Sequence, residues 1–523
     1  MTEQPAAGDG DGGVAVPVAG ARRIWILAFV GFLLTIGAWS VAAPYDGTPD
    51  EREHMIRAAG VAAGEIAPPP AAAKKGSGAF QDVPAGLVRE QCWQFKPTVS
   101  AACAVPPGSD DTPVRAGTGA GRYHPVYYAL VGWPLDIWPG WSGVLLARFI
   151  SAGIAAALLA SAFVVAVNWS RRRLMIAGLL VAVTPMAAQM ASAVNPNGVE
   201  IAAGVAFFAA TIPLFLDRRP KPHHGLLILA GISGLLLAML RQTGPLWLAA
   251  AFVAFAFPWR QSNVGRLVRE KAVWWWVGGI AVAALTAVGW GVVMKSSDLG
   301  KYGGHVYTYG QAALAEADRW RSYLDQMVGV TSWLDTRMPA PIYLTWQFVA
   351  ATLLIGAFVF GRLVDRWRLL VLVVAGTVVP SVMQVALVKQ TGFVTQGRYM
   401  LPMLGGAMLF AAYVWEERGL DATRSRTLVR LSVILLLPIQ LFTLILTMVR
   451  WQDGLPKYLT FRTFNPFAGD WHPPLGSITP LLASVLGLTL LGVLAWRVSM
   501  RPLNEPDEPT PVIAEQTPAT DLR

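Results

Sequence analysis

Runs of about twenty consecutive apolar residues, separated by charged or Pro/Gly-rich breaks, recur along this chain and constrain its fold more than any other feature. A helix of about 20 residues spans the hydrocarbon core of a bilayer. Of the 523 residues, 54% are hydrophobic and only 14% are charged, whereas soluble domains carry roughly 25% charged residues. The sequence therefore predicts an integral membrane protein that crosses the bilayer many times.

We expect an all-α fold with about twelve transmembrane helices. The first apolar run follows Arg22 and Arg23, as a signal peptide would, but it exceeds the roughly 7 to 15 residues of a signal-peptide core. We therefore expect it to be retained. The predicted spans are 24–43, 142–168, 174–194, 199–216, 225–240, 245–259, 272–294, 341–361, 369–388, 399–415, 428–449 and 478–496.

Arginine and lysine are unevenly divided between the two sides that these spans define. With the N-terminus inside, the short outer turns hold only Arg241, Lys389 and Arg398. This asymmetry follows the positive-inside rule, so we expect a multi-pass protein of the bacterial plasma membrane with both termini cytoplasmic. The inner segments that carry most of the cations are 171–173, 218–221, 260–271, 362–368, 418–430 and 497–501.

One polytopic membrane domain, 23–500, is expected between two disordered cytoplasmic tails, 1–22 and 501–523, whose Gly, Pro and acidic residues favour disorder. Long outer loops favour an enzyme, because transporters usually keep their connections short. We expect short surface helices in the first of these loops. The long outer loops are 44–141, 295–340 and 450–477.

Cys92 and Cys103 lie in the first outer loop and are the only cysteines of the chain. An outer loop faces an oxidising space, where disulfides form and persist. We expect these two residues to form a disulfide, and an unpaired, unreactive pair is the alternative.

The stretch "APYDGTPDEREHMIRAAG", 43–60, places acidic residues directly after the first span. One interpretation is structural, with Thr48 as the N-cap of a helix and Glu51 completing a capping box. That leaves Asp50 and His54, which would share one helix face because they are four residues apart. An ionised Asp beside a His suits general-base catalysis, so Asp50, Glu51 and His54 are the candidate catalytic residues.

Two further stretches hold candidate binding residues. In "RYHPVYYALVGWPLDIW", Tyr123 and His124 belong to an aromatic-rich segment, which is typical either of the membrane interface or of a sugar-binding cleft. In "SAVNPNGVE", Asn195 and Asn197 form a strong turn signal. Their amides are also suited to binding a hydroxylated ligand at the membrane surface.

A set of cations is expected inside the bundle, near its outer surface. The spans 225–240 and 245–259 rise only about 22 Å each, so the turn between them, with Arg241, should lie below the surface. An intramembrane charge is functional by default, with helix tilt and snorkelling as the alternative. The stretch "KQTGFVTQGRYMLP" adds Lys389, Arg398 and Tyr399. Together these cations predict an anion site, for which a lipid phosphate is available.

The motifs "PDEREH", "YHPVYY", "NPNG" and "QGRYMLP" resemble, in this order, a family of bacterial multi-pass membrane proteins of unknown function that is grouped with the GT-C glycosyltransferases. The resemblance covers roughly 24–420. It implies a GT-C-like bundle, a catalytic acid in the first outer loop, here Asp50 with Glu51 as the rival, and a sugar donor linked to polyprenyl phosphate. The many alanines and the preference for Arg over Lys suggest an actinobacterial source.

The function we expect is a membrane glycosyltransferase that moves a sugar from a polyprenyl-phosphate carrier to a cell-envelope glycan or lipid on the outer face. The partners would be that donor, the acceptor and membrane lipids. No nucleic acid is expected, because the net charge of +10 forms no continuous basic face. We expect no metal site and no tightly bound cofactor, and a divalent cation at the phosphate stays open. The alternatives are a transporter or flippase of a lipid-linked precursor, and an inactive scaffold.

The expected orientation can be tested by labelling introduced thiols in intact cells. Asp110→Cys, in the first long loop, should react with a membrane-impermeant reagent, because that loop is expected outside. Arg172→Cys should react only after the cells are permeabilised. The opposite pattern would invert the topology.

Overall fold

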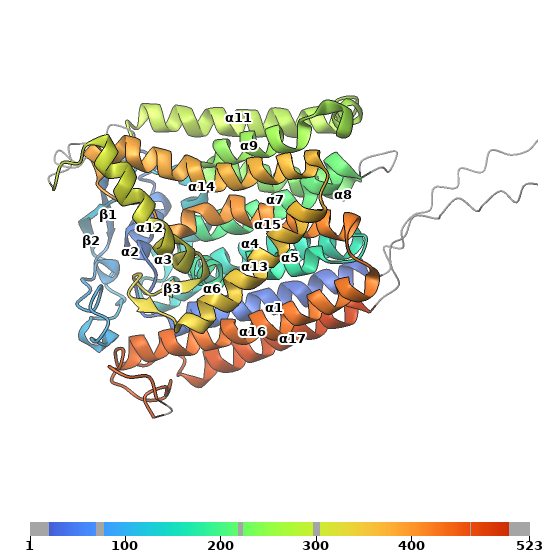
Figure 1. The fold of residues 1–523 in the computed structure, drawn as a ribbon. Helices are drawn as coiled ribbons and strands as arrows, with labels where there is room; N and C mark the ends of the chain where they lie inside the picture. The colour runs from blue at the N-terminus through green and yellow to red at the C-terminus, as the bar shows by residue number, and fades with distance from the viewer. Residues whose placement is uncertain (1–19, 70–77, 218–222, 297–303, 461, 501–523) are drawn as a thin grey trace, which may run out of the picture.

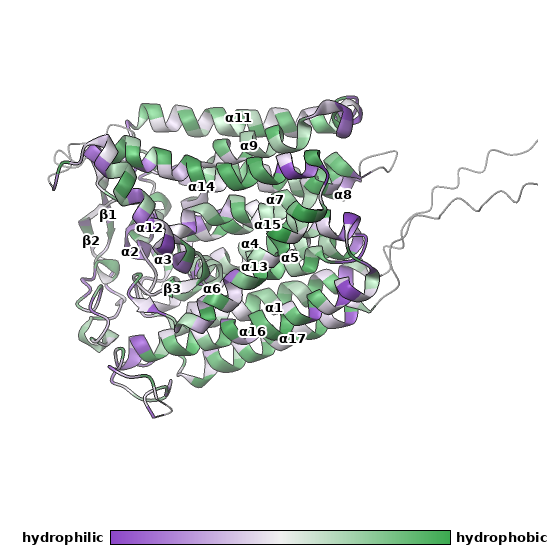
Figure 2. Ribbon diagram, viewed as in Figure 1, coloured by the Kyte–Doolittle hydropathy of each residue, from purple (hydrophilic) through white to green (hydrophobic). Residues whose placement is uncertain are grey.

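The computed structural model describes residues 20–69, 78–217, 223–296, 304–460 and 462–500. It is a bundle of long helices lying side by side, with β1, β2, α2 and α3 gathered beyond one end (Figure 1). Hydrophobic residues cover the shafts of the helices, and hydrophilic residues concentrate at the two ends of the bundle (Figure 2). This distribution is that of a membrane protein. Most of the first predicted tail, and all of the second, lie outside the described residues.

Every predicted span is helical, although one is divided in two. Among the described residues, eight helices are long and apolar enough to cross a membrane; the predicted count of twelve crossings remains a prediction. These eight are α1 (Ala21–Ala42), α4 (Trp141–Asn168), α7 (Pro196–Leu216), α11 (Lys271–Val293), α13 (Ala340–Phe360), α14 (Leu363–Thr391), α16 (Ala422–Gln452) and α17 (Ile478–Ser499). The other predicted spans are α5 (Met175–Ala182) with α6 (Pro185–Ala191), α8 (His224–Leu240), α9 (Gly244–Ala256) and α15 (Leu401–Arg418).

The predicted span 174–194 breaks between α5 and α6. Thr184 is the N-cap of α6 and accepts a hydrogen bond from the backbone N–H of Ala187 at 3.1 Å, and Pro185 occupies the first helical position. A proline there cannot continue the preceding helix. The carbonyl of Val183, freed by the break, accepts a hydrogen bond of 2.7 Å from Gln440. The expectation of one continuous helix was wrong because this Thr-Pro pair was not recognised as a helix start.

Small residues let the central helices approach closely. A Cβ at Gly487 of α17 would lie 2.8 Å from the carbonyl oxygen of Gly31 in α1, and one at Gly204 of α7 would lie 2.6 Å from that of Pro402 in α15. Small residues at such contacts are typical of helix packing in membranes. The large buried core therefore runs through the middle of the bundle.

The end of the bundle that carries β1, β2, α2 and α3, called the outer end because we expect it to face outward, is not all-α, which corrects that part of the expected fold class. Within 44–141, β1 and β2 pair antiparallel, with Ala79 opposite Thr118 and Pro84 opposite Pro113. Within 295–340, α12 begins at a capping box formed by Thr308 and Gln311 and is followed by a two-stranded sheet.

The remaining helices and strands have the following bounds: α2 (Glu51–Ala62), β1 (Ala79–Pro84), β2 (Pro113–Thr118), α3 (Pro125–Ile137), α10 (Val264–Leu267), α12 (Tyr309–Gly329), β3 (Val330–Thr331) and β4 (Thr336–Arg337). The 3-10 turns are η1 (Ala85–Leu87), η2 (Ala101–Cys103), η3 (Trp259–Gln261) and η4 (Gly397–Met400).

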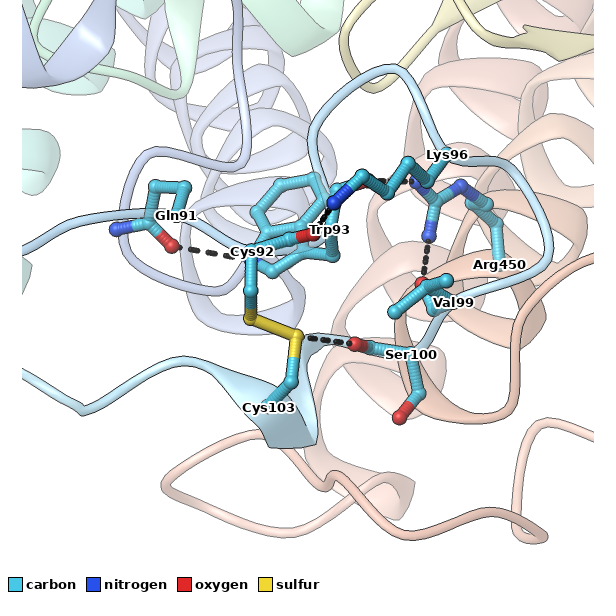
Figure 3. The surroundings of a disulfide bond; sticks show 8 residues. All are labelled: Gln91, Cys92, Trp93, Lys96, Val99, Ser100, Cys103 and Arg450. Atoms are coloured by element: carbon cyan, nitrogen blue, oxygen red, sulfur yellow. Dashed lines mark hydrogen bonds between the residues drawn. A yellow bond between two sulfur atoms is a disulfide. The ribbon is translucent and has the colours of Figure 1, made fainter.

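A disulfide joins Cys92 and Cys103, whose Cα atoms are 6.0 Å apart (Figure 3). The loop that it closes wraps around the buried guanidinium of Arg450, at the end of α16. Arg450 donates to the carbonyl oxygens of Val99 at 2.7 Å and Trp93 at 2.9 Å. The outer loop is thereby fixed to the bundle both covalently and by hydrogen bonds.

Removing the disulfide should lower the stability of the outer loop. The paired substitution Cys92→Ser with Cys103→Ser should cost about 2 to 3 kcal/mol, because it releases a short closed loop in the unfolded chain. Thermal unfolding of the purified protein, with and without a reductant, measures the loss. Wild type should fall to the melting temperature of the variant when reduced. A variant that melts like the oxidised wild type would contradict the expectation.

Candidate functional site

The acidic stretch folds as a tight turn between α1 and α2. Asp46 and Asp50 both have positive φ angles, of 60° and 67°, a region in which Asp is one of the better-tolerated residues. Asp50, and not Thr48, is the N-cap of α2, and its side chain makes no capping hydrogen bond. The hydroxyl of Thr48 is buried without a hydrogen-bond partner. The expected capping box is therefore wrong, because the left-handed turn at Asp50 starts the helix two residues later.

Glu51 forms a buried ion pair with Arg148 of α4. Its two carboxylate oxygens accept hydrogen bonds of 2.8 and 2.7 Å from that guanidinium, and both side chains are at most 1% exposed. A carboxylate held in this way from both oxygens has a structural role. The geometry argues against Glu51 as the rival catalytic acid.

Asp50 is paired differently, with Arg398 of η4. One carboxylate oxygen lies 2.6 Å from Nη2 of Arg398. The Asp50 side chain is 45% exposed, whereas that of Arg398 is 1% exposed. Burial raises the pKa of the Asp50 carboxyl, but the charge of the adjacent Arg398 guanidinium outweighs this effect and lowers it. Asp50 is therefore ionised, and its carboxylate is open on the side away from the arginine.

His54 lies in the first turn of α2, and its backbone N–H donates to the carbonyl of Asp50 at 3.1 Å. Its Nδ1 is 2.8 Å from the hydroxyl of Tyr128, and its ring centroid is 5.7 Å from that of Tyr123. Burial lowers the pKa of His54 to about 3, although Asp50 opposes the shift. The imidazole is consequently neutral at physiological pH and shares one hydrogen bond with the Tyr128 hydroxyl.

Arg241 and Arg398 both lie against the ring of Tyr399. The guanidinium carbon of Arg241 is 4.4 Å from the ring centroid and that of Arg398 is 5.1 Å from it. The two arginines come from the α8–α9 turn and from the segment before α15, which are far apart in the sequence. The structure thus brings Asp50, Arg241, Arg398 and Tyr399 together at the outer end of the bundle. An aromatic ring between two cations partly offsets their mutual repulsion.

Glu200 supplies the nearby negative charge for Arg241. Its Oε2 is 3.8 Å from Nε of Arg241, and its carboxylate accepts hydrogen bonds from Asn197 at 3.0 Å, Thr243 at 3.2 Å and Trp247 at 3.3 Å. Glu200 itself is 1% exposed. The α8–α9 turn is therefore attached to the first turn of α7.

The two asparagines support this arrangement from the start of α7. Asn195 is the N-cap of that helix, accepting from the backbone N–H of Asn197 at 3.0 Å, and it donates to the carbonyl of Pro49 at 3.1 Å. Arg398 donates to the same carbonyl at 3.4 Å. The predicted turn is present, and α7 begins at Pro196, three residues before the predicted span 199–216. The bond to Pro49, which fixes the position of Asp50, could not be expected from the sequence.

Two other candidates have different surroundings. The amine of Lys389 lies 4.3 Å from the ring centroid of Tyr309 on α12. Among the described residues, no hydrogen bond or ion pair joins it to Asp50 or Arg398. His124 is the N-cap residue of α3, and its ring stacks edge-on with Trp290 at 5.6 Å. Within the described part of the chain, no group of three or more His, Cys, Asp or Glu residues is arranged to hold a metal ion.

Arg148 and Tyr128 were missed by the sequence reasoning. Arg148 is a single charge inside the apolar run "GVLLARFISAG". A charge in such a place signals a buried partner. Tyr128 belongs to a stretch rich in aromatic residues, so nothing in the sequence distinguishes it from its neighbours.

The thermal stability of variants should distinguish the roles of the two neighbouring acids, Glu51 and Asp50. Glu51→Gln leaves Arg148 as a buried charge without its counter-ion and should cost about 3 to 5 kcal/mol. Asp50→Asn also removes a counter-ion, that of Arg398, but water reaches the Asp50 side chain, so its cost should be clearly smaller than that of Glu51→Gln. Melting temperatures of the detergent-purified variants provide the comparison. Equal losses would show that Asp50 is as structural as Glu51.

The family model described as "Predicted membrane protein (DUF2142)" matches residues 32–406, which confirms the resemblance drawn from the motifs. No curated protein matches the chain. Two crystal structures of ArnT from Cupriavidus metallidurans are similar at 11% identity. The one bound to undecaprenyl phosphate has a TM-score of 0.44 and covers 91% of this chain, the apo one has 0.41 and covers 92%, and each match spans 77% of the ArnT chain. Scores of this size carry no argument about fold or reaction. Because the family model matches well over half of its length, the chain belongs to the DUF2142 family of membrane proteins.

Proposed function

We propose that this protein is a GT-C-type membrane glycosyltransferase, which transfers a sugar from a polyprenyl-phosphate carrier to a cell-envelope glycan or lipid on the outer face of the membrane. The observation that carries the proposal is the Asp50–Arg398 pair, in which an open carboxylate meets a buried guanidinium. The sequence motifs, which resemble a family grouped with the GT-C enzymes, point to the same class.

The phosphate of the donor would bind at Arg398 and Arg241. Both guanidinium groups lie against Tyr399, so an anion placed there would meet two positive charges. In the present structure Asp50 is the counter-ion of Arg398. An incoming phosphate would compete for that guanidinium, because arginine binds phosphate and carboxylate with similar geometry.

Binding of the donor would also prepare Asp50 for catalysis. An aspartate whose pKa is lowered by an arginine is a weak base, since a base works best with a pKa near the operating pH. Once Arg398 turns to the phosphate, Asp50 loses much of the charge that lowers its pKa. Binding of the donor would then itself raise the pKa of Asp50. Asp50 would become an effective base only when the donor is present.

The transfer itself would be a single displacement in which Asp50 takes the proton of the acceptor hydroxyl. The hydroxyl oxygen bonds to the anomeric carbon, and the bond between that carbon and the phosphate oxygen breaks. The electron pair leaves with the polyprenyl phosphate, whose negative charge Arg398 and Arg241 stabilise. His54 follows Asp50 in the first turn of α2, and its ring centroid is 5.7 Å from that of Tyr123; aromatic rings near the reacting groups would suit packing against a sugar.

Asp50→Asn tests the proposal in a deletion strain complemented with the wild-type or variant gene. The substitution preserves size but removes the base, so transfer should fall by about 10² to 10⁴. The strain should then accumulate the lipid-linked sugar at its outer surface, as the deletion does. The matched control is Asp82→Asn, which changes an exposed carboxylate on β1 and should restore transfer.

Three results are distinguishable in the lipid and wall-glycan analysis. Full complementation by Asp50→Asn, with the protein present at wild-type level, would refute Asp50 as the base. A lipid-linked sugar trapped on the inner side of the deletion strain would indicate a flippase instead. An unchanged lipid and glycan profile in the deletion strain would remove the transferase proposal altogether.

A further inference from the structure

A groove of about 790 Å³ lies between α12 and α14. It shares no lining residue with the cluster around Asp50 and Arg398. On α12, the small side chains of Ala313 and Ala317 leave room for it. On α14, its wall includes Val378 and Val382, which are exposed. Figure 1 shows α12 crossing beside one end of α14.

The position of the groove makes it accessible to lipid. α14 is long and apolar enough to cross the membrane, so exposed valines on its surface face hydrocarbon chains. The lining on α14 belongs to the second half of this helix, from Thr377 to Ala386, and the helix ends at Thr391. A molecule in the groove would therefore have its apolar part inside the bilayer and its head at the surface where α12 lies.

Cations are held at that surface. The amine of Lys389, in the last turn of α14, lies over the ring of Tyr309, which itself lines the groove. Arg319 of α12 lies over the ring of Phe393 at 4.1 Å from the centroid. Lysine and arginine at a membrane surface attract anionic lipid headgroups, each contributing about 1 kcal/mol.

Besides the cations at its surface end, the groove has polar side chains deeper along its length. Glu316 is 3% exposed. Its Oε2 accepts a hydrogen bond of 2.9 Å from Tyr323, and its carboxylate also interacts with the hydroxyl of Ser381 on the opposite wall. Ser381 and Lys389 are eight residues apart on one helix, about 12 Å along its axis. The Ser381 hydroxyl is thus a donor inside an otherwise apolar wall, where it could also bind an acceptor oxygen of a ligand.

We propose that the α12–α14 groove binds an anionic glycerophospholipid. Its phosphate would lie at Lys389, its glycerol and ester groups beside Glu316 and Ser381, and its acyl chains along Val378 and Val382. A glycerophospholipid has polar groups at two depths, as the groove does. A polyprenyl phosphate has a polar group only at its head, so it would place an apolar isoprenoid chain against Glu316 and Ser381.

A lipid bound here would support the candidate site through α12. Gln326 of α12 accepts a hydrogen bond of 2.8 Å from the backbone N–H of Gly397, the residue before Arg398. A Cβ at Gly397 would lie 2.3 Å from the carbonyl oxygen of Tyr323, so the two segments are in close contact. The lipid would therefore stabilise the segment that carries Arg398 without touching the reacting groups.

The test measures lipid retention and melting temperature of the delipidated, detergent-purified protein. Phosphatidylglycerol should remain bound in native mass spectrometry and raise the melting temperature, and phosphatidylcholine with the same chains should do so much less. Val382→Trp fills the groove and should abolish both effects. Lys389→Gln should weaken binding about fivefold, as expected for one charge. Met383→Trp is the matched control, because Met383 is the next residue, is also exposed and does not line the groove.

Several outcomes would overturn the proposal. One is that Val382→Trp responds to phosphatidylglycerol as wild type does. Another is that the two phospholipids stabilise the protein equally, since the cations would then have no part in binding. A third is that polyprenyl phosphate binds in the groove and displaces phosphatidylglycerol, which would make the groove part of the donor's path. Each readout is independent of sugar transfer, so the result stands whether or not the proposed reaction is correct.

Discussion

The geometry of the outer end depends on the buried guanidinium of Arg148. Its five N–H groups make five hydrogen bonds, two to the carboxylate of Glu51 and three to the carbonyl oxygens of Ser40, Ala43 and Pro44. Five is the full donor capacity of an arginine. The carbonyls belong to the end of α1 and the residues after it, which no longer have helical partners. One side chain of α4 therefore terminates α1 and fixes the start of α2, and so determines where Asp50 lies.

The second buried arginine of the site is satisfied much less completely. Arg398 has one short bond, to Asp50; its contacts with the Pro49 carbonyl, the Met190 sulfur and the Tyr399 hydroxyl are 3.4, 3.2 and 3.2 Å long, and its Nε has no hydrogen-bond partner. The two adjacent acids, Glu51 and Asp50, therefore form two different kinds of ion pair. The arginine paired with Glu51 has no donor left for a ligand, whereas the pair with Asp50 retains the Nε donor, several long contacts and an open carboxylate. Incomplete hydrogen bonding of a buried charge is costly, and it is expected where a ligand completes the set.

The sequence predicted the helices well, because apolar runs of membrane length leave few alternatives to a helix. It predicted β1, β2 and α12 poorly, since these lie in outer segments without a strong hydrophobic period. We could predict that Asp50, Arg241 and Arg398 lie together, because a charge inside a helix bundle is costly unless it has a partner. Lys389 was grouped with them because it also lies in an outer turn. Its actual neighbour is Tyr309 of α12, a helix that the prediction did not contain.

The capping pattern around Thr48 shows why local signals could not assign the acids. "TPDE" fits a capping box as well as it fits the observed turn, in which Asp50 has a left-handed backbone. The choice between them is made by Arg148 and Arg398, which lie about 100 and 350 residues further along the chain. Only tertiary contacts of that kind override a local preference.

The depth of the site also limits which substrates could reach it. α8 and α9 have 17 and 13 residues, which rise about 26 and 20 Å, less than the hydrocarbon core of about 30 Å. In a bilayer of that thickness we expect the turn that carries Arg241 to lie below the surface; its charge is balanced by Glu200. A water-soluble sugar nucleotide would have to leave water to reach such a depth, whereas a phosphate attached to a lipid chain is already held at the membrane boundary. A position of this kind would therefore agree with the lipid-linked donor that we propose.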